Sequence, residues 1–288
     1  MWWRIIPQMK DIAPPTGKQN LLPKNAENAD SAPLFCLSRQ KLVYGRDIEN
    51  ELLWLQHTYL VIVAKAIAAR VLGFEVDDPA DLLSGRRFAA MGVSGAVESD
   101  FFDWVLENAK GRDLIVRLAR HVARFRLHDV EIDVLKVLYE ALIDRAERNG
   151  LGEYYTPDWL AAKMVRQTID KPLSQRVLDP ACGSGTFLFH AVRHHLAAAG
   201  NAGTDDRRRA EAACALVAGV DIHPVAVIIA RVTYLLALGE ALTTRSGSIS
   251  IPVYVGDSMQ LSVSRAPRTM TSFSSDCSPS RQDGDRGS

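Results

Sequence analysis

The stretch Asp179-Pro-Ala-Cys-Gly-Ser-Gly-Thr-Phe187 decides the fold of this chain. It follows the short apolar run Arg176-Val-Leu-Asp179 and leads into an apolar segment of helical length, which predicts a strand, a tight turn and a helix. The glycines at 183 and 185 permit positive φ and close approach of a ligand, and the helix start offers unpaired N–H groups. Ligands of open parallel sheets bind at such strand ends. The stretch therefore predicts a ligand-binding turn.

Two classes of ligand fit such a turn: a dinucleotide and S-adenosylmethionine (SAM). The dinucleotide pattern G-x-G-x-x-G needs a third glycine, and the corresponding residue in Gly183-Ser-Gly185-Thr-Phe-Leu188 is leucine. Asp179 at the strand end would repel a pyrophosphate, whereas it suits the ammonium and sulfonium charges of SAM. These residues favour SAM; a dinucleotide and a turn without ligand remain the alternatives.

Two further predicted strands also end in an acid. Ala215-Leu-Val-Ala-Gly-Val220 leads to Asp221, and Ile251-Pro-Val-Tyr-Val255 leads to Gly256-Asp257. An acid after the second strand can accept the hydroxyl groups of a ribose; Ile222 beside it can lie against an adenine, and Asp257 can accept a hydrogen bond from the adenine amine. A single strand-end aspartate is a common turn former, but three in succession indicate a nucleoside-binding edge.

The order of the predicted elements divides the chain into four parts. Residues 1–44 read as a disordered leader, 45–150 as an all-helical domain, 151–261 as an α/β part with a Rossmann-like parallel sheet, and 262–288 as a disordered tail rich in Ser, Arg and Asp. Helices are expected at 47–73, 101–108, 112–126 and 130–148, with a connection at 74–99. Thr156-Pro157-Asp158 reads as a helix start with Thr156 as N-cap.

Composition excludes several classes of protein. Lys plus Arg and Asp plus Glu number 34 each, so nucleic-acid binding cannot be argued from total charge. No two of the four cysteines (Cys36, Cys182, Cys214 and Cys277) form a C-x-x-C pair, which fits a reducing, cytoplasmic setting. The start of the chain has no signal-peptide pattern, and the apolar segment 52–72 contains Lys65 and Arg70, so a buried helix is expected and no membrane partner.

Four motifs in this chain resemble those of one enzyme family. Gly152-Glu-Tyr-Tyr-Thr-Pro157, the stretch 179–187, Val220-Asp-Ile-His-Pro224 and Gly256-Asp-Ser258 occur in the order found in adenine-N6 DNA methyltransferases of restriction–modification systems. The long interval between Asp179 and Asp221 is similar to that of type I modification subunits and fused type II-like enzymes. The resemblance covers about residues 45–261 and implies a partial SAM-dependent methyltransferase sheet after the helical domain.

The resemblance implies a role for each motif residue. Tyr155, Thr156 and Pro157 would border the methionine part of SAM, and Asp179 would face its ammonium group. The turn residues would line the cofactor, Asp221 would hold the ribose, Ile222 the adenine, and Asp257 the adenine amine with Ser258 nearby. The turn residues are Pro180, Ala181, Gly183, Ser184 and Gly185. In the full-length family the substrate is double-stranded DNA with a flipped adenine, and a specificity or restriction subunit is the expected partner.

The sequence departs from the family at the catalytic motif, Asn/Asp-Pro-Pro-aromatic. The one Pro-Pro pair, Pro14-Pro15, lies between Ala13 and Thr16, far upstream of the other motifs. No catalytic residue is therefore assigned, and we expect a chain that is inactive alone, truncated or frame-shifted near codon 261. An Asn-Pro-Pro-aromatic string in another reading frame downstream would support that expectation. The alternatives are a non-catalytic SAM-binding or DNA-associating subunit that needs a partner, and a methyltransferase acting on RNA or protein.

Other polar clusters have ordinary interpretations. The arginines at 117, 120 and 124 share one helix face and could follow DNA phosphates, but a solvated face is favoured. The histidines at 190, 194 and 195 lack the glutamate of a zinc H-E-x-x-H motif, so no metal site is assigned. His223 is expected to be a loop residue and Cys182 a small packing residue.

Overall fold

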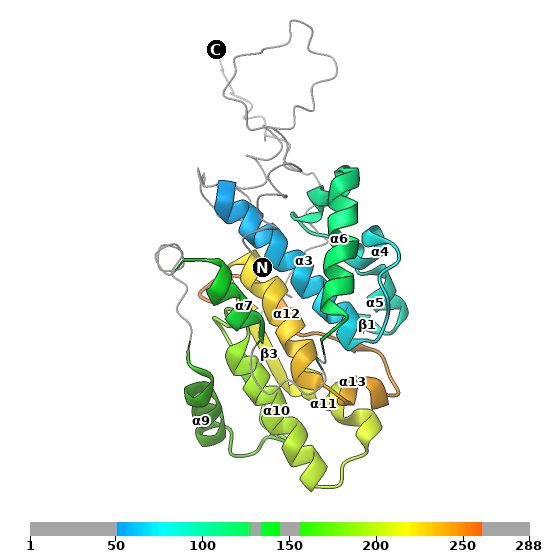
Figure 1. The fold of residues 1–288 in the computed structure, drawn as a ribbon. Helices are drawn as coiled ribbons and strands as arrows, with labels where there is room; N and C mark the ends of the chain where they lie inside the picture. Colours follow the sequence, from blue (N-terminus) through cyan, green and yellow to red (C-terminus); the bar gives the residue numbers. More distant parts are fainter. Residues whose placement is uncertain (1–50, 126, 128–133, 145–155, 261–288) are drawn as a thin grey trace, which may run out of the picture.

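A computed structural model of the chain describes residues 51–125, 127, 134–144 and 156–260. Two apolar helices, α3 (Glu51–Val71) and α12 (Pro224–Leu238), run side by side through its middle (Figure 1). Every residue of α12 from Val225 to Leu238 is buried. A helix that is apolar on all faces packs inside a core, so these two helices form the centre on which the other elements are arranged.

The main sheet is parallel and has the strand order β2-β3-β5. The strands are β2 (Val177–Asp179), β3 (Val217–Asp221) and β5 (Val253–Val255), and α10 (Thr186–Asn201) and α12 connect them. Gly219 of β3 permits this packing, because a Cβ there would lie 2.6 Å from a methyl carbon of Leu188 on α10. The prediction of parallel strands alternating with helices is confirmed. The described residues contribute three strands to this sheet, so a complete Rossmann-like sheet is not seen in them.

The helical region contains more structure than its sequence pattern predicted. The expected helices are α3, α6 (Ala109–Val122), α7 (Val134–Leu142) and, as a 3-10 helix, η2 (Asp103–Glu107). The segment predicted as a connection contains α4 (Pro79–Ser84) and α5 (Arg86–Ala90). The side chain of Asp78 caps α4 by accepting the Ala80 N–H, and Gly85 ends it at φ 72°. The polar residues and glycines that indicated a loop are thus helix caps.

A second, two-stranded parallel sheet links the helical region to the C-terminal part. β1 (Val93–Ser94) pairs with β4 (Ile249–Ser250). Nearby, the buried Arg231 of α12 lies 2.8 Å from the Glu98 carboxylate and donates to the carbonyl of Val253 at 2.9 Å. Buried side chains of both regions belong to one hydrophobic cluster. The predicted boundary near residue 150, the leader 1–44 and the tail 262–288 lie outside the described residues.

Three more helices complete the described chain: α9 (Asp158–Thr168), α11 (Asp206–Leu216) and α13 (Ala241–Thr244). Helix α11 was not predicted, because it buries only the small residues Ala210 and Ala213 and shows no apolar stripe. Its sequence signal is the cap: the side chain of Asp205 accepts the Arg207 N–H.

One helix in the described part of the chain, over Leu52–Val71, is long and apolar enough to cross a membrane. Its apolar window is 94% buried inside the protein, however, so internal packing accounts for its composition.

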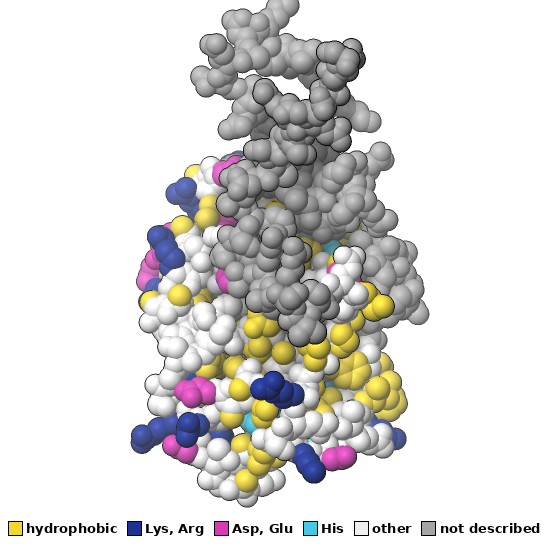
Figure 2. All heavy atoms as spheres, turned by 180° about the vertical axis from the view of Figure 1, so that it is seen from behind, with side chains coloured by type: hydrophobic (Ala, Val, Ile, Leu, Met, Phe, Trp, Pro, Cys, Tyr) yellow, Lys and Arg dark blue, Asp and Glu magenta, His cyan; other side chains and the backbone are white. Residues whose placement is uncertain are grey.

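Hydrophobic side chains gather on the surface of the molecule that is seen from behind in Figure 2. The outer strand β2 also exposes an apolar residue, since 58% of Leu178 is accessible to solvent.

Candidate functional site

The three predicted acids lie at one edge of the main sheet. Asp179 is the last residue of β2, Asp221 is the last residue of β3, and Asp257 follows β5 by two residues. Because the three strands are parallel neighbours, their carboxyl ends meet at the same edge. The main chain continues this alignment beyond β5, where the Gly256 N–H donates to the Asp221 carbonyl at 2.9 Å. The structure therefore brings together the acids that the sequence singled out.

The Asp221 carboxylate connects two loops at this edge. Its Oδ2 accepts the N–H of Gly183, in the turn after β2, at 2.8 Å. Its Oδ1 accepts the N–H of His223, at the start of α12, also at 2.8 Å. A carboxylate offers about four acceptor positions, so Asp221 can hold both loops and still accept a ribose hydroxyl.

Asp179 is the least satisfied acid of the site. Its Oδ1 accepts the Ala181 N–H at 3.2 Å, while its buried Oδ2 has no hydrogen-bond partner among the residues that the structure describes. Burial raises the pKa of Asp179, the bond from Ala181 opposes this, and the nearby charge of Asp221 adds to it. In the described part of the chain, neither Asp179 nor Asp221 forms an ion pair with a lysine or arginine. The two carboxylates therefore form a negative centre that would attract a cationic ligand.

The two glycines of the turn have different reasons to be glycine. Both adopt positive φ, 53° at Gly183 and 94° at Gly185. A Cβ at Gly183 would meet open space, which leaves that face of the turn accessible to a ligand. A Cβ at Gly185 would lie 3.1 Å from the Cα of Ala230 on α12. The expected ligand approach thus suits Gly183, whereas Gly185 is required by close helix packing.

The helix that follows the upstream motif begins one residue later than predicted. Pro157, and not Thr156, is the N-cap of α9, and it makes no side-chain cap bond. The prediction of Thr156 as N-cap is therefore wrong. The Thr156 carbonyl is held instead by the buried ammonium group of Lys136 on α7. Tyr155, the third predicted residue of this motif, lies outside the described residues.

The remaining predicted residues differ in exposure. Ile222 is 69% exposed next to Asp221, and so is available to a flat ligand. Asp257 accepts the Met259 N–H at 2.9 Å, and Ser258 beside it is half-buried. In the turn, Pro180 and Ala181 are exposed, whereas Ser184 is buried. Asp179 and Pro180 also line an apolar pocket of about 240 Å³ between α9, β2 and α10.

The histidines of α10 join it to the preceding segment. His190 Nε2 lies 3.1 Å from Asp158 Oδ1, His194 Nε2 lies 3.1 Å from the Ile169 carbonyl, and His195 Nδ1 lies 2.7 Å from the Pro172 carbonyl. Each ring therefore has a structural partner. Cys182 is buried beside Gly219, and burial raises the pKa of its thiol, which agrees with a packing role and not with a reactive thiolate.

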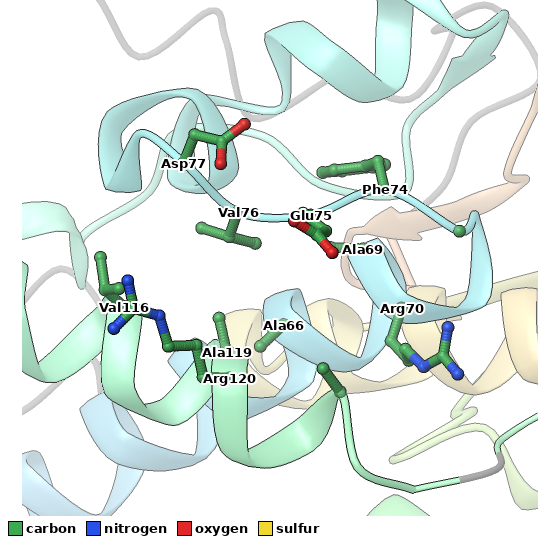
Figure 3. Close-up of a pocket in the computed structure, with 12 residues that line it drawn as sticks. Ala66, Ala69, Arg70, Phe74, Glu75, Val76, Asp77, Val116, Ala119 and Arg120 are labelled. Carbon is green, nitrogen blue, oxygen red and sulfur yellow. The ribbon is translucent and has the colours of Figure 1, made fainter.

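The arginine face of α6 borders a separate pocket. Arg117 pairs with Asp113 at 3.0 Å on the helix surface. Arg120 lines a pocket of about 630 Å³ between α3, α6 and the segment after α3, together with the acids Glu75 and Asp77 (Figure 3). The mixture of charges along this pocket gives it no single preference for DNA phosphates.

Two contacts that could not be found from the sequence lie behind the strand-end edge. Lys136 holds the Thr156 carbonyl, and the ring of His57 on α3 lies edge-on to the ring of His223, with centroids 6.1 Å apart. Lys136 stands among apolar residues at helical spacing, and His57 lies within an apolar helix. A lysine or histidine on a buried face was the available signal, but nothing in the sequence named its partner.

Comparison with known proteins agrees with the motifs. Residues 130–240 match the family model described as N-6 DNA Methylase. The Adenine-specific methyltransferase PglX of Streptomyces coelicolor is 32% identical over 136 residues, which are 42% of this chain and 11% of that protein. The Type I restriction enzyme EcoEI methylase subunit of Escherichia coli is 40% identical over 58 residues, 20% of this chain and 12% of that protein.

A third relative aligns over more of the chain. The Type I restriction enzyme MjaVIII methylase subunit of Methanocaldococcus jannaschii is 24% identical over 174 residues, 60% of this chain and 28% of that protein. The chain thus spans between 11% and 28% of the length of these relatives. With its strand-end acids and its match over residues 130–240, the chain resembles the adenine-N6 DNA methyltransferases of restriction–modification systems.

Proposed function

We propose that this chain binds SAM at the strand-end edge and supplies the cofactor-binding part of an adenine-N6 DNA methyltransferase. The observation that carries the proposal is the buried Oδ2 of Asp179, which has no hydrogen-bond partner among the described residues and lies near the Asp221 charge. A buried anionic oxygen is costly without a partner, and the ammonium group of SAM supplies one. Asp221 and Ile222 would then hold the ribose and adenine, with Asp257 at the adenine amine.

The chemistry of SAM defines what the residues of this chain would have to do. SAM supplies a methyl group on a positively charged sulfur, which is ready for transfer to a nucleophile. The residues of this chain bind and orient that donor: Gly183 leaves the turn open and Asp221 holds the turn against the start of α12. The expected acceptor is an adenine flipped out of double-stranded DNA, in a cytoplasmic setting and with a specificity or restriction subunit as partner.

The groups that position the adenine amine are the missing part. An adenine amine is a weak nucleophile, so positioning and electrostatic stabilisation must supply the rate. The Asn/Asp-Pro-Pro-aromatic string that would do this does not occur in the sequence. This observation favours a second candidate function, a SAM-binding subunit whose partner chain contributes the amine-holding groups.

Calorimetry on the full chain tests the proposal. We expect SAM to bind and NAD not to bind, and we expect Asp221→Ala to lower SAM affinity by about 10- to 100-fold, since hydrogen bonds to charged groups contribute roughly 1.5–3 kcal/mol. The matched control is Asp113→Ala, which removes a surface aspartate on α6. Binding of NAD without SAM would overturn the proposal.

A transfer assay separates the two candidate functions. We expect no transfer of labelled methyl groups from SAM to unmethylated DNA by the chain alone. Turnover by the chain alone would show that it contains its own amine-holding groups and would exclude the partner-dependent candidate.

A further inference from the structure

We propose that helix α7 is a positioning element that holds both ends of the cofactor site, through two side chains one helical turn apart. Lys136 fixes the end assigned to the methionine part of SAM. Tyr139 fixes, through His57 and His223, the end assigned to the nucleoside. The inference rests on the proposed function and adds to it residues of the helical region that lie behind the site.

Lys136 provides the first connection. The residue is 5% exposed, and its ammonium group donates to the Thr156 carbonyl and lies 3.7 Å from Asp158 Oδ2. A buried ammonium group needs such acceptors. Asp158 is also in contact with His190 of α10 at 3.1 Å. The corner that begins α9 is therefore attached to α7 on one side and to α10 on the other.

Tyr139 provides the second connection. It lies three residues after Lys136, and residues at this spacing share one face of a helix. Its ring stacks on the ring of His57, with centroids 5.9 Å apart and planes inclined by 21°, and its hydroxyl lies 3.4 Å from His57 Nε2. The ring of His57 also contacts the ring of His223, which lies edge-on to it with the two centroids 6.1 Å apart. Burial lowers the pKa of His57 to about 3, so this ring is neutral at pH 7.

The main chain of His223 carries this contact into the site. Its N–H donates to Asp221 Oδ1 at 2.8 Å, while Ile222 between them is 69% exposed. With the His223 ring packed against His57 on the inside, Ile222 faces solvent on the outside. Moving the ring would shift the N–H that holds Asp221 and change how Ile222 is presented. The contact with α3 and α7 thus sets the geometry of the nucleoside end.

The experiment compares two ligands on the full chain, SAM and 5′-methylthioadenosine, which lacks the amino-acid part. We expect Lys136→Met to weaken SAM binding about three- to tenfold, a range typical of residues that act through others, and to leave 5′-methylthioadenosine affinity unchanged. We expect His57→Leu to weaken both ligands by a similar factor. A general loss of stability would not produce this difference between ligands.

The matched control is Ile62→Val, a mild change at a fully buried position of α3. The inference would be overturned if the wild type binds SAM and both Lys136→Met and His57→Leu bind the two ligands with wild-type affinity. It would also be overturned if Ile62→Val lowers the affinity for both ligands as much as His57→Leu does. Either result would leave the proposed function unaffected.

A second measurement needs no ligand. Hydrogen exchange of the Gly183 and His223 amides, which both donate to Asp221, should be about tenfold faster in His57→Leu than in the wild type or Ile62→Val, because local opening rates follow local stability. If the wild type binds neither ligand, the proposed function fails, and unchanged exchange in His57→Leu would then overturn the connection through His57 as well.

Discussion

Two pairs of aspartates lie partly buried in the described part of the chain, and only one of the pairs has a lysine partner there. Asp100 and Asp103 surround Lys65, whose Nζ lies 2.8 Å and 3.1 Å from their oxygens. Asp179 and Asp221 receive hydrogen bonds from main-chain N–H groups, and Asp179 Oδ2 has no partner in the described ranges 51–125, 127, 134–144 and 156–260. Buried charges persist when they are paired. The first pair therefore has a cationic partner within the fold, whereas the second has none among the described residues; the proposed cofactor carries a positive charge.

The largest expected effect is on stability, from removal of the lysine. Lys65 is 1% exposed, and Lys65→Met leaves two partly buried aspartates without their cation. We expect the free energy of unfolding to fall by about 3–5 kcal/mol, the usual loss when one partner of a buried ion pair is removed. Urea unfolding followed by circular dichroism measures it.

The triple variant Lys65→Met, Asp100→Asn, Asp103→Asn is the control for this prediction. It removes all three charges, so it should recover at least half of the lost stability. If Lys65→Met is as stable as the wild type, Lys65 does not stabilise Asp100 and Asp103, and the comparison between the two pairs of aspartates fails.

The second prediction concerns Asp179, where a substitution should change ligand affinity and stability in opposite directions. Because burial raises the pKa of Asp179 above its ordinary value, its ionised form costs stability at pH 7, and Asp179→Asn should stabilise the unliganded chain. The same change should weaken SAM binding by about 10- to 100-fold, through loss of a charge-assisted contact.

Calorimetry and urea unfolding on one preparation measure both effects of Asp179→Asn. Asp113→Asn, a change of the same type on the surface of α6, should move neither quantity. A loss of stability in Asp179→Asn, at unchanged SAM affinity, would mean that Asp179 is structural and not a ligand-binding acid.

The smallest effect is a pH dependence of the aspartates that contact Lys65. Burial raises the pKa of Asp103 to about 6; Lys65 opposes this and Asp100 adds to it. The pKa of Asp103 in the folded chain is therefore above the value of about 3.9 expected in the unfolded chain. Protonation of Asp103 stabilises the fold fully below about pH 3.9, and this stabilisation is lost as the pH rises through about 6. Between pH 7 and pH 5 the wild type should therefore gain about 1 kcal/mol relative to Asp103→Asn.

Unfolding midpoints of the wild type and Asp103→Asn at the two pH values test this difference. His57, whose lowered pKa acts in the opposite direction, is present in both chains and cancels. An equal difference in stability at pH 5 and pH 7 would contradict the raised pKa.

Much of the strand-end edge could be predicted, because its signals are local. Apolar runs that end in an acid indicated β2, β3 and β5, and the parallel order then required their ends to meet. The strands β1 and β4 could not be found in this way, since each is two residues long and pairs across more than 150 positions. Strands of two residues show no alternation that a sequence pattern could reveal.

The sequence by itself predicted the cofactor class and located the three acids and the turn that contains Gly183, because strand ends, glycine conformation and charge are properties of short segments. Only the tertiary structure shows how these segments are held. Asp221 connects two loops, and Gly185 allows the turn to pack closely against Ala230. Lys136 contacts Thr156, and His57 contacts His223. These contacts join residues far apart in the chain. Their partners are selected by the shape and burial of the whole core, which no local pattern records.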